Sequence, residues 1–153
     1  PRGSAHQGLR EYQAPVEYGR SEIIRKGKKI AVLGVGSMIP SCMEICKGLK
    51  DDGYDPTFVN ARFVKPLDVD LLDELAKDHS LFVTVEENVK SGGYGEHVSA
   101  YMEACHPEIR VLSAAVWDRF VPQGNVESLR SRIGLGVEDI RQAIEDSEEL
   151  KEQ

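Results

Sequence analysis

The regular exchange of strand-like and helix-like segments from residue 29 onward limits the fold of this chain more than any other feature of its sequence. Apolar runs alternate with segments whose apolar residues recur every three or four positions, which is typical of amphipathic helices. The pattern predicts strands at 29–33, 57–60, 81–85 and 109–116, and helices at 39–49, 68–78 and 98–105. Helices between parallel strands require right-handed crossovers, so helices should cover both faces of the sheet.

One further strand is predicted at residues 21–25, separated from the strand at 29–33 by a three-residue connection that contains Gly27. A connection this short joins antiparallel neighbours, so the pattern predicts a hairpin. Two short helices, around residues 126–133 and 137–144, should close the domain. The predicted fold class is α/β, a three-layer α/β/α domain with about five strands, mostly parallel with one antiparallel edge strand.

Composition narrows the class of protein further. The chain has 153 residues, 41% of them hydrophobic, and a formal net charge of −7, which favours one folded domain that needs neither disulfide nor metal to hold a core. The acidic balance argues against nucleic acid or an anionic membrane as partner. No apolar run approaches the ~20 residues of a membrane span. Three cysteines without zinc-finger or CxxC spacing fit a reduced, cytoplasmic setting.

The domain is expected to span residues 16–146, between an arm at 1–15 and an acidic tail at 147–153. The arm is polar and aperiodic, and it starts at Pro1 without an initiator Met, so the chain is either a piece of a longer protein or carries a cloning remnant. From Glu138 onward seven acidic residues stand against two basic ones, which indicates a solvated tail.

The turn Gly34-Val35-Gly36-Ser37 lies where a strand gives way to a helix, the place at which dinucleotide folds bind phosphate. The third small residue of that fingerprint is missing, since Ile39 stands there, and no acidic residue ends the next strand. We therefore interpret it as a tight turn in which Ser37 caps the following helix, and expect Asp68 to cap the next one.

Glu86, Glu87 and Asn88 follow the strand at 81–85, at the sheet edge where α/β proteins bind their ligands. Successive strand residues point to opposite faces, so the two carboxylates cannot grip one atom together. One of them is expected to bond the glycine loop at 91–95, which favours an interface or loop-bracing role over catalysis.

The other chemically capable side chains give no site. The four histidines have no metal-ligand spacing, and no Ser-His-Asp group can be assembled from local sequence. His79 and His106 follow predicted helices, where a cation would offset the helix dipole. Cys42 and Cys46 lie one helical turn apart on the apolar face and should be buried and inert. The residues alone thus predict an α/β domain with an interaction surface at its strand ends.

Four segments together carry a resemblance. They are Asn60-Ala61-Arg62-Phe63-Val64-Lys65-Pro66-Leu67-Asp68, Val83-Thr84-Val85-Glu86-Glu87-Asn88, Gly92-Gly93-Tyr94-Gly95 and Asp118-Arg119-Phe120-Val121-Pro122-Gln123-Gly124. In this order and spacing they resemble the C-terminal domain of the 1-deoxy-D-xylulose-5-phosphate synthase family, thiamine-diphosphate enzymes of the transketolase superfamily. The first two segments are the specific ones.

The resemblance implies an enzyme that decarboxylates pyruvate and joins the two-carbon unit to glyceraldehyde 3-phosphate, for isoprenoid, thiamine and pyridoxal synthesis. Thiamine diphosphate and Mg2+ are bound in that family by two upstream domains. The fragment is therefore expected to hold no catalytic, cofactor or metal residue, to be inactive alone, and to supply contacts to the upstream domains and a homodimer.

The resemblance also suggests individual residues. Arg2 matches an Arg in a stretch beside the sugar-phosphate site, so it is a candidate for binding the substrate phosphate. The inter-domain or interface candidates are Glu86, Glu87, Asn88, Gly92, Gly93, Asp118 and Gln123. Gln123 stands where many relatives have His, so no ionisable role is expected there.

Two alternatives stay open at this point. One is the equivalent domain of a transketolase or of a 2-oxoacid dehydrogenase beta subunit. The other, from a different class, is a stand-alone regulatory module that binds a small anion at the turn 34–37.

Overall fold

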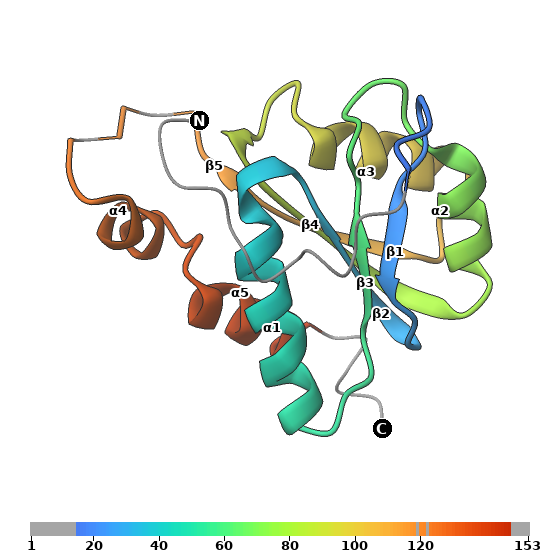
Figure 1. The fold of residues 1–153 in the computed structure, drawn as a ribbon, viewed down its shortest axis with the longest axis horizontal. Coiled ribbons are helices and arrows are strands. Elements are labelled where there is room, and N and C mark those ends of the chain that lie inside the picture. Colours follow the sequence, from blue (N-terminus) through green and yellow to red (C-terminus); the bar gives the residue numbers. More distant parts are fainter. Residues whose placement is uncertain (1–14, 119, 122, 148–153) are drawn as a thin grey trace.

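The computed structural model describes residues 15–118, 120–121 and 123–147, and shows a central sheet with helices on both faces (Figure 1). The strands are β1 (Glu22–Arg25), β2 (Lys29–Gly34), β3 (Thr57–Asn60), β4 (His79–Val89) and β5 (Arg110–Val116). The helices are the 3-10 turn η2 (Gly36–Met38), α1 (Ile39–Asp51), α2 (Val69–Ala76), α3 (Tyr94–Cys105), α4 (Val126–Arg132) and α5 (Val137–Glu145). No helix within the described ranges has the length and apolar run that crossing a bilayer would take.

The sheet has five strands in the order β1-β3-β2-β4-β5. β2 pairs in parallel with β3 and β4, and β4 pairs in parallel with β5, whereas β1 runs antiparallel to β3 at the edge. The α/β class, the three layers and the single antiparallel edge strand are therefore confirmed.

The predicted hairpin is wrong, because β1 pairs with β3 and not with its sequence neighbour β2. The connection at 26–28 passes the start of β3: the Lys28 amide donates to the Asp55 carbonyl at 2.6 Å, and the Gly27 amide to Thr57 Oγ1 at 2.8 Å. A Cβ on Gly27 would lie 2.1 Å from the Asp55 carbonyl oxygen. Two strand spacings are only about 10 Å, so a short connection can skip one strand.

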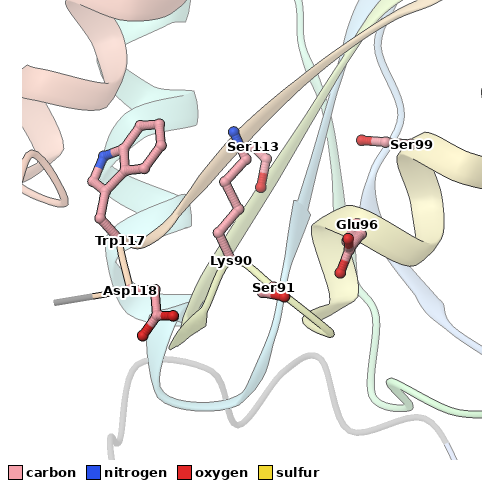
Figure 2. A pocket seen from close by; sticks show the side chains of 7 residues that line it. All are labelled: Lys90, Ser91, Glu96, Ser99, Ser113, Trp117 and Asp118. Atoms are coloured by element: carbon pink, nitrogen blue, oxygen red, sulfur yellow. The ribbon is translucent and has the colours of Figure 1, made fainter.

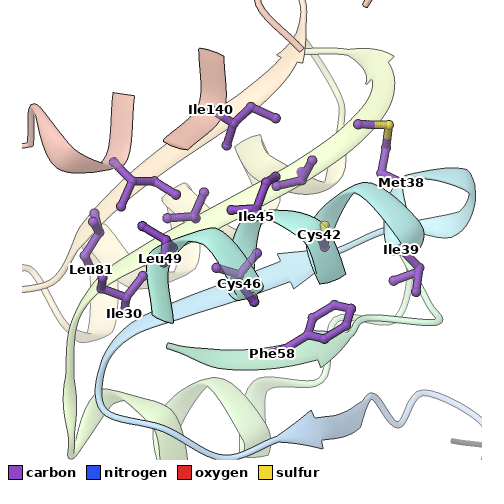
Figure 3. Packing of buried hydrophobic residues seen from close by; sticks show 14 of the residues in the cluster. Ile30, Met38, Ile39, Cys42, Ile45, Cys46, Leu49, Phe58, Leu81 and Ile140 are labelled. Atoms are coloured by element: carbon purple, nitrogen blue, oxygen red, sulfur yellow. The ribbon is translucent and has the colours of Figure 1, made fainter. Parts of the chain in front are cut away.

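Apolar side chains fill both faces of the sheet. α1 and α5 enclose one cluster against β2 and β4, and α2 and α3 enclose a second cluster on the opposite face. Figure 3 shows the first cluster, in which Cys42 and Cys46 lie among Ile45, Leu49 and Phe58. Both thiols are buried as expected, and burial raises the pKa of Cys46 to about 12. These cysteines are packing residues at neutral pH.

Of the two predicted helix caps, one is confirmed and the other is wrong. The Asp68 carboxylate accepts from the Leu71 amide at 3.4 Å, and also from the Ser21 amide at 2.7 Å, so it caps α2 and fastens the start of β1. Ser37 does not cap α1, because the turn η2 comes between and Met38 occupies the cap position. The Ser37 hydroxyl instead donates to Glu87 at 2.6 Å.

The outer ends of α2 and α3 are joined by polar side chains. Asp73 Oδ1 accepts from the Tyr101 hydroxyl at 2.7 Å and lies 2.8 Å from His106 Nε2. Both hydrogen bonds lower the pKa of Asp73, and the bond with His106 has the larger effect. His106 caps the C-terminus of α3, the position expected for it. Cys105, predicted on the apolar face of this helix, is exposed.

His79 is buried at the start of β4 and not the cation expected at a helix end. Its Nε2 lies 2.7 Å from Thr57 Oγ1, and its Nδ1 lies 2.8 Å from the Leu75 carbonyl oxygen. Because the carbonyl can only accept, Nδ1 carries the proton, and the Thr57 hydroxyl donates to Nε2. Burial lowers the pKa of His79, so the neutral ring is the form that belongs to the fold.

This arrangement predicts a loss of stability in mild acid. A histidine whose pKa is lowered by folding contributes stability that is complete above its ordinary pKa of about 6.5 and is lost as the pH falls below it. Urea unfolding between pH 7.5 and 5.5 should show a steeper decrease in the free energy of unfolding for the native chain than for His79→Gln. Parallel pH profiles would contradict the assignment.

Candidate functional site at the carboxyl end of the sheet

The carboxyl ends of the parallel strands meet at one edge of the sheet, and Glu86 anchors this edge from within. Its side chain is fully buried, with Oε2 accepting from the Tyr94 amide at 2.9 Å and Oε1 from the Gly95 amide at 2.8 Å. Both amides belong to the first turn of α3, where the helix dipole favours a negative charge. Glu86 therefore fixes the start of α3 to the end of β4.

The glycines of the loop leave room for this buried carboxylate. A Cβ on Gly93 would lie 2.6 Å from Glu86 Oε1, and a Cβ on Gly95 would lie 2.3 Å from Ser113 Oγ and 2.5 Å from Thr84 Oγ1. Gly92 has a φ of +73°, which favours glycine. The prediction that one of the two adjacent carboxylates bonds the glycine loop is confirmed.

Glu87 points away from Glu86 and binds other elements. Its Oε2 accepts from the Ser37 hydroxyl at 2.6 Å, and its Oε1 accepts from Arg130 Nε at 3.0 Å and lies 2.9 Å from Arg130 Nη2. Glu87 thus joins β4 to η2 and to α4. In the described part of the chain, no group of three His, Cys, Asp or Glu side chains is placed to hold a metal ion.

The turn 34–37 is poorly suited to an anion. The Ser37 hydroxyl is occupied by the Glu87 carboxylate, which would repel one. The Val35 amide donates to the Val85 carbonyl and the Met38 amide to the Val35 carbonyl. Gly34 is needed for packing, since a Cβ there would lie 2.7 Å from Cys42 Sγ.

The other interface candidates lie around this anchor. Asn88 donates to Glu86 Oε2 at 3.2 Å, and Gly93 is buried against the same carboxylate. Asp118 and Gln123 are exposed in the segment that follows β5. The structure therefore brings Glu86, Asn88 and the Gly92-Gly93 loop together. Glu87 points to other elements, and Asp118 and Gln123 lie in the segment after β5. Arg2 lies outside the described residues.

A pocket that was not predicted from the sequence opens beside these strand ends (Figure 2). Its volume is about 370 Å³, and it is lined by Lys90, Ser91, Glu96, Ser99, Ser113, Trp117 and Asp118. Lys90 Nζ lies 4.8 Å from the centre of the Trp117 ring, a cation–π distance. Nothing local in the sequence links these residues, because β4 and β5 bring them together by pairing Val89 with Val116.

Exposed apolar side chains stand at the end of β4 and along the segment that leads from β5 into α4. Trp117 is 58% exposed and Phe120 fully exposed, and Val89, Val121 and Val126 are also accessible. We call these five residues the strand-end patch. Exposed apolar groups in one region are typical of an interaction surface. The signal was present in the sequence as the apolar residues that continue after the strand at 109–116.

The residues at the carboxyl end of the sheet are better suited to an interaction surface than to catalysis. Both strand-end carboxylates are held by donors, Glu86 by amides and Glu87 by a hydroxyl and a guanidinium. The pocket offers an ammonium, an indole, carboxylates and hydroxyls, but among its described lining residues no hydroxyl or amine is hydrogen-bonded to a basic side chain. We therefore interpret the strand ends as a docking face.

Comparison with known proteins shows the family of this chain. The sequence profile of the transketolase C-terminal domain matches residues 19–140. A 1-deoxy-D-xylulose-5-phosphate synthase from Lachnoclostridium phytofermentans is 38% identical over 92% of this chain and 23% of its own length. The protein of the same name from Dictyoglomus thermophilum is 39% identical over 90% of this chain and 22% of its own length. The chain thus spans less than a quarter of these relatives.

Solved structures match as well. A protein described as a split gene transketolase, inactive beta4 tetramer, gives a TM-score of 0.82 at 28% identity, covering 90% of this chain and 44% of that one. The transketolase of Campylobacter jejuni gives a TM-score of 0.54 at 14% identity, over 84% of this chain and 19% of that one, which supports the fold alone.

The same substitution is expected to have unequal effects at the two strand-end carboxylates. Glu86→Gln places an amide NH2 group against a backbone N–H and removes a charge from two buried hydrogen bonds, so it should lower the free energy of unfolding by about 2–3 kcal/mol. Glu87→Gln is the matched control, because its partners are partly exposed, and should cost less than about 1 kcal/mol. Urea unfolding of both variants tests this, and equal losses would contradict the anchoring role of Glu86.

Proposed function

The chain belongs to the transketolase C-terminal domain family, and from this premise we propose that it forms the C-terminal domain of a 1-deoxy-D-xylulose-5-phosphate synthase. The observation that carries the proposal is the match of nearly the whole chain, at 38% identity, to a part of such a synthase. The split gene transketolase is 28% identical, so a synthase parent is favoured over a transketolase parent. The relatives and structures reported above are synthases and transketolases, which favours a synthase parent over a 2-oxoacid dehydrogenase beta subunit.

The whole enzyme would condense pyruvate with glyceraldehyde 3-phosphate and release CO2. Thiamine diphosphate, bound with Mg2+, supplies the carbanion chemistry in such an enzyme. The described residues do not fit this cofactor, because both carboxylates at the strand ends are already held by other donors and no cluster of metal ligands stands beside them. We therefore assign cofactor binding to parts of the parent outside this chain, and propose that the chain alone is inactive.

The proposed role of the domain is structural, in contacts with the upstream domains and in a homodimer. The strand-end patch supports this role, since Trp117 and Phe120 have the size and exposure of interface anchors. Asp118 lies between these two aromatic residues in the sequence, and Gln123 follows them. The loop that borders the patch would be held in place by Glu86, Asn88, Gly92 and Gly93.

The folded domain would span residues 16–146 between an arm and an acidic tail, and Arg2 of the arm would bind the phosphate of glyceraldehyde 3-phosphate. A reduced, cytoplasmic setting is supported by three free cysteines. A stand-alone anion-binding module is disfavoured by the Glu87 carboxylate at the turn 34–37.

The function is tested by assaying the parent enzyme beside the isolated chain. The parent should form 1-deoxy-D-xylulose 5-phosphate from pyruvate and glyceraldehyde 3-phosphate, and the chain should not. Loss of a guanidinium–phosphate contact in Arg2→Ala of the parent should raise the KM for glyceraldehyde 3-phosphate about tenfold or more. Turnover by the chain alone, or its micromolar binding of thiamine diphosphate with Mg2+ in calorimetry, would overturn the proposal.

The interface role is tested by removing the aromatic anchors from the parent. Trp117→Ser with Phe120→Ser should weaken dimerisation about a thousandfold, because each of the two anchors at an interface contributes about 2 kcal/mol and about 1.4 kcal/mol corresponds to a factor of ten. Val16→Ser, at an exposed position near the start of the described chain, is the control. Sedimentation across a concentration series measures the effect, and an unchanged dimer constant would show that the strand-end patch is not the contact.

A further inference from the structure

A groove of about 270 Å³ lies between α1 and the edge strand β1, and its residues are distinct from those of the strand-end pocket. Its floor is apolar and consists of Ile24, Met43, Cys46 and Phe58. Cys46 and Phe58 belong to the buried cluster drawn in Figure 3, so the floor of the groove is the edge of the core itself.

The groove exists because the sheet is wider than the helices that cover it. α1 packs on β2 and β3, whereas β1 extends the sheet by one further strand on the outer side of β3. Ile24 of β1 and Met43 of α1 are therefore only partly buried. This strip of apolar surface is what an apolar ligand would cover.

All the charged residues that line the groove are cations. Arg25 is oriented by donating from Nη2 to the Pro56 carbonyl at 2.7 Å, and its Nη1 lies 3.8 Å from Asp55. Lys47 and Lys50 are exposed on successive turns at the C-terminal end of α1, and across the described ranges neither has an acidic partner within 4.0 Å. In a chain with a net charge of −7, three cations around one apolar floor form a local reversal of charge.

We propose that this groove binds an amphiphilic anion, a small molecule with a short apolar tail and a phosphate or carboxylate head. The tail lies against Met43, Cys46 and Phe58, and the head lies between Lys47, Lys50 and Arg25. A volume of 270 Å³ corresponds to about nine water molecules at roughly 30 Å³ each, which suits a short tail. A stable protein partner would instead need about 800 Å² of surface on this side.

The three methionines make the site directly observable. Met43 lines the groove, whereas Met38 and Met102 are fully buried elsewhere. In a chain labelled with 13C at the methionine methyl groups, octyl phosphate below its critical micelle concentration should shift the Met43 signal and leave the other two in place. Octanoate in a second titration distinguishes a carboxylate head from a phosphate head.

Control ligands and variants distinguish the contribution of the charged head to binding from that of the apolar tail. Inorganic phosphate lacks the tail and 1-octanol lacks the charge, so each should shift Met43 far less than octyl phosphate at the same concentration. Lys47→Gln with Lys50→Gln should weaken binding about three- to tenfold, because each pairing at an exposed site is weak. Lys77→Gln, on the far side at the end of α2, is the matched control and should bind like the native chain.

Three outcomes would overturn the proposal. The first is an unmoved Met43 signal with both anionic probes. The second is an equal shift with 1-octanol, which would show a simple apolar surface. The third is a shift of Met38 or Met102 in place of Met43, which would put binding elsewhere. Met43→Leu assigns the signal and, as a volume-conserving change, leaves the fold in place.

Discussion

The buried carboxylate of Glu86 is the interaction on which the carboxyl end of this domain depends. An ionised group taken out of water is costly unless it is paired or fully hydrogen-bonded, and here two amides at the positive end of α3 supply the bonds. The same contact requires glycine at 93, because a side chain there would collide with Glu86, whereas glycine at 95 is required by the close approach of Ser113 and Thr84. One acidic residue thus fixes the start of α3 against the end of β4 and accounts for the glycine at 93.

The alternation of strand-like and helix-like apolar patterns in the sequence predicted most of the fold. Every strand and α-helix from β2 to β5 was expected near its observed place, since buried parallel strands and amphipathic helices leave clear patterns, whereas the turn η2 was not expected. The pairing of β1 was not predicted, because a connection of three residues limits the distance between two strands but does not say which strand lies between them. The end of β4 was also missed, because Glu86, Glu87 and Asn88 interrupt the apolar run although the backbone remains extended.

The functional surface was predicted only where it depends on one segment. Strand alternation was enough to infer that Glu86 and Glu87 face opposite ways and that one of them bonds the following loop. The contact of Lys90 with Trp117 and the groove beneath Lys47 involve residues from different elements, and their spacing in the sequence carries no trace of that proximity. Ser37 was mispredicted for the same reason. Its residue type suits a helix cap, but its hydroxyl donates to a carboxylate fifty positions away in the sequence.

The pairing of β1 with β3, and not with its sequence neighbour β2, has a consequence for biosynthesis. The partner of β1 ends at Asn60, so a ribosome must add about 35 more residues after Arg25 before the pair can form. At 5–20 residues per second this delay is about 2–7 s. During that interval the nascent β1 has no native neighbour in the emerging polypeptide, and the outer rim of the sheet is completed only after translation has passed the third strand.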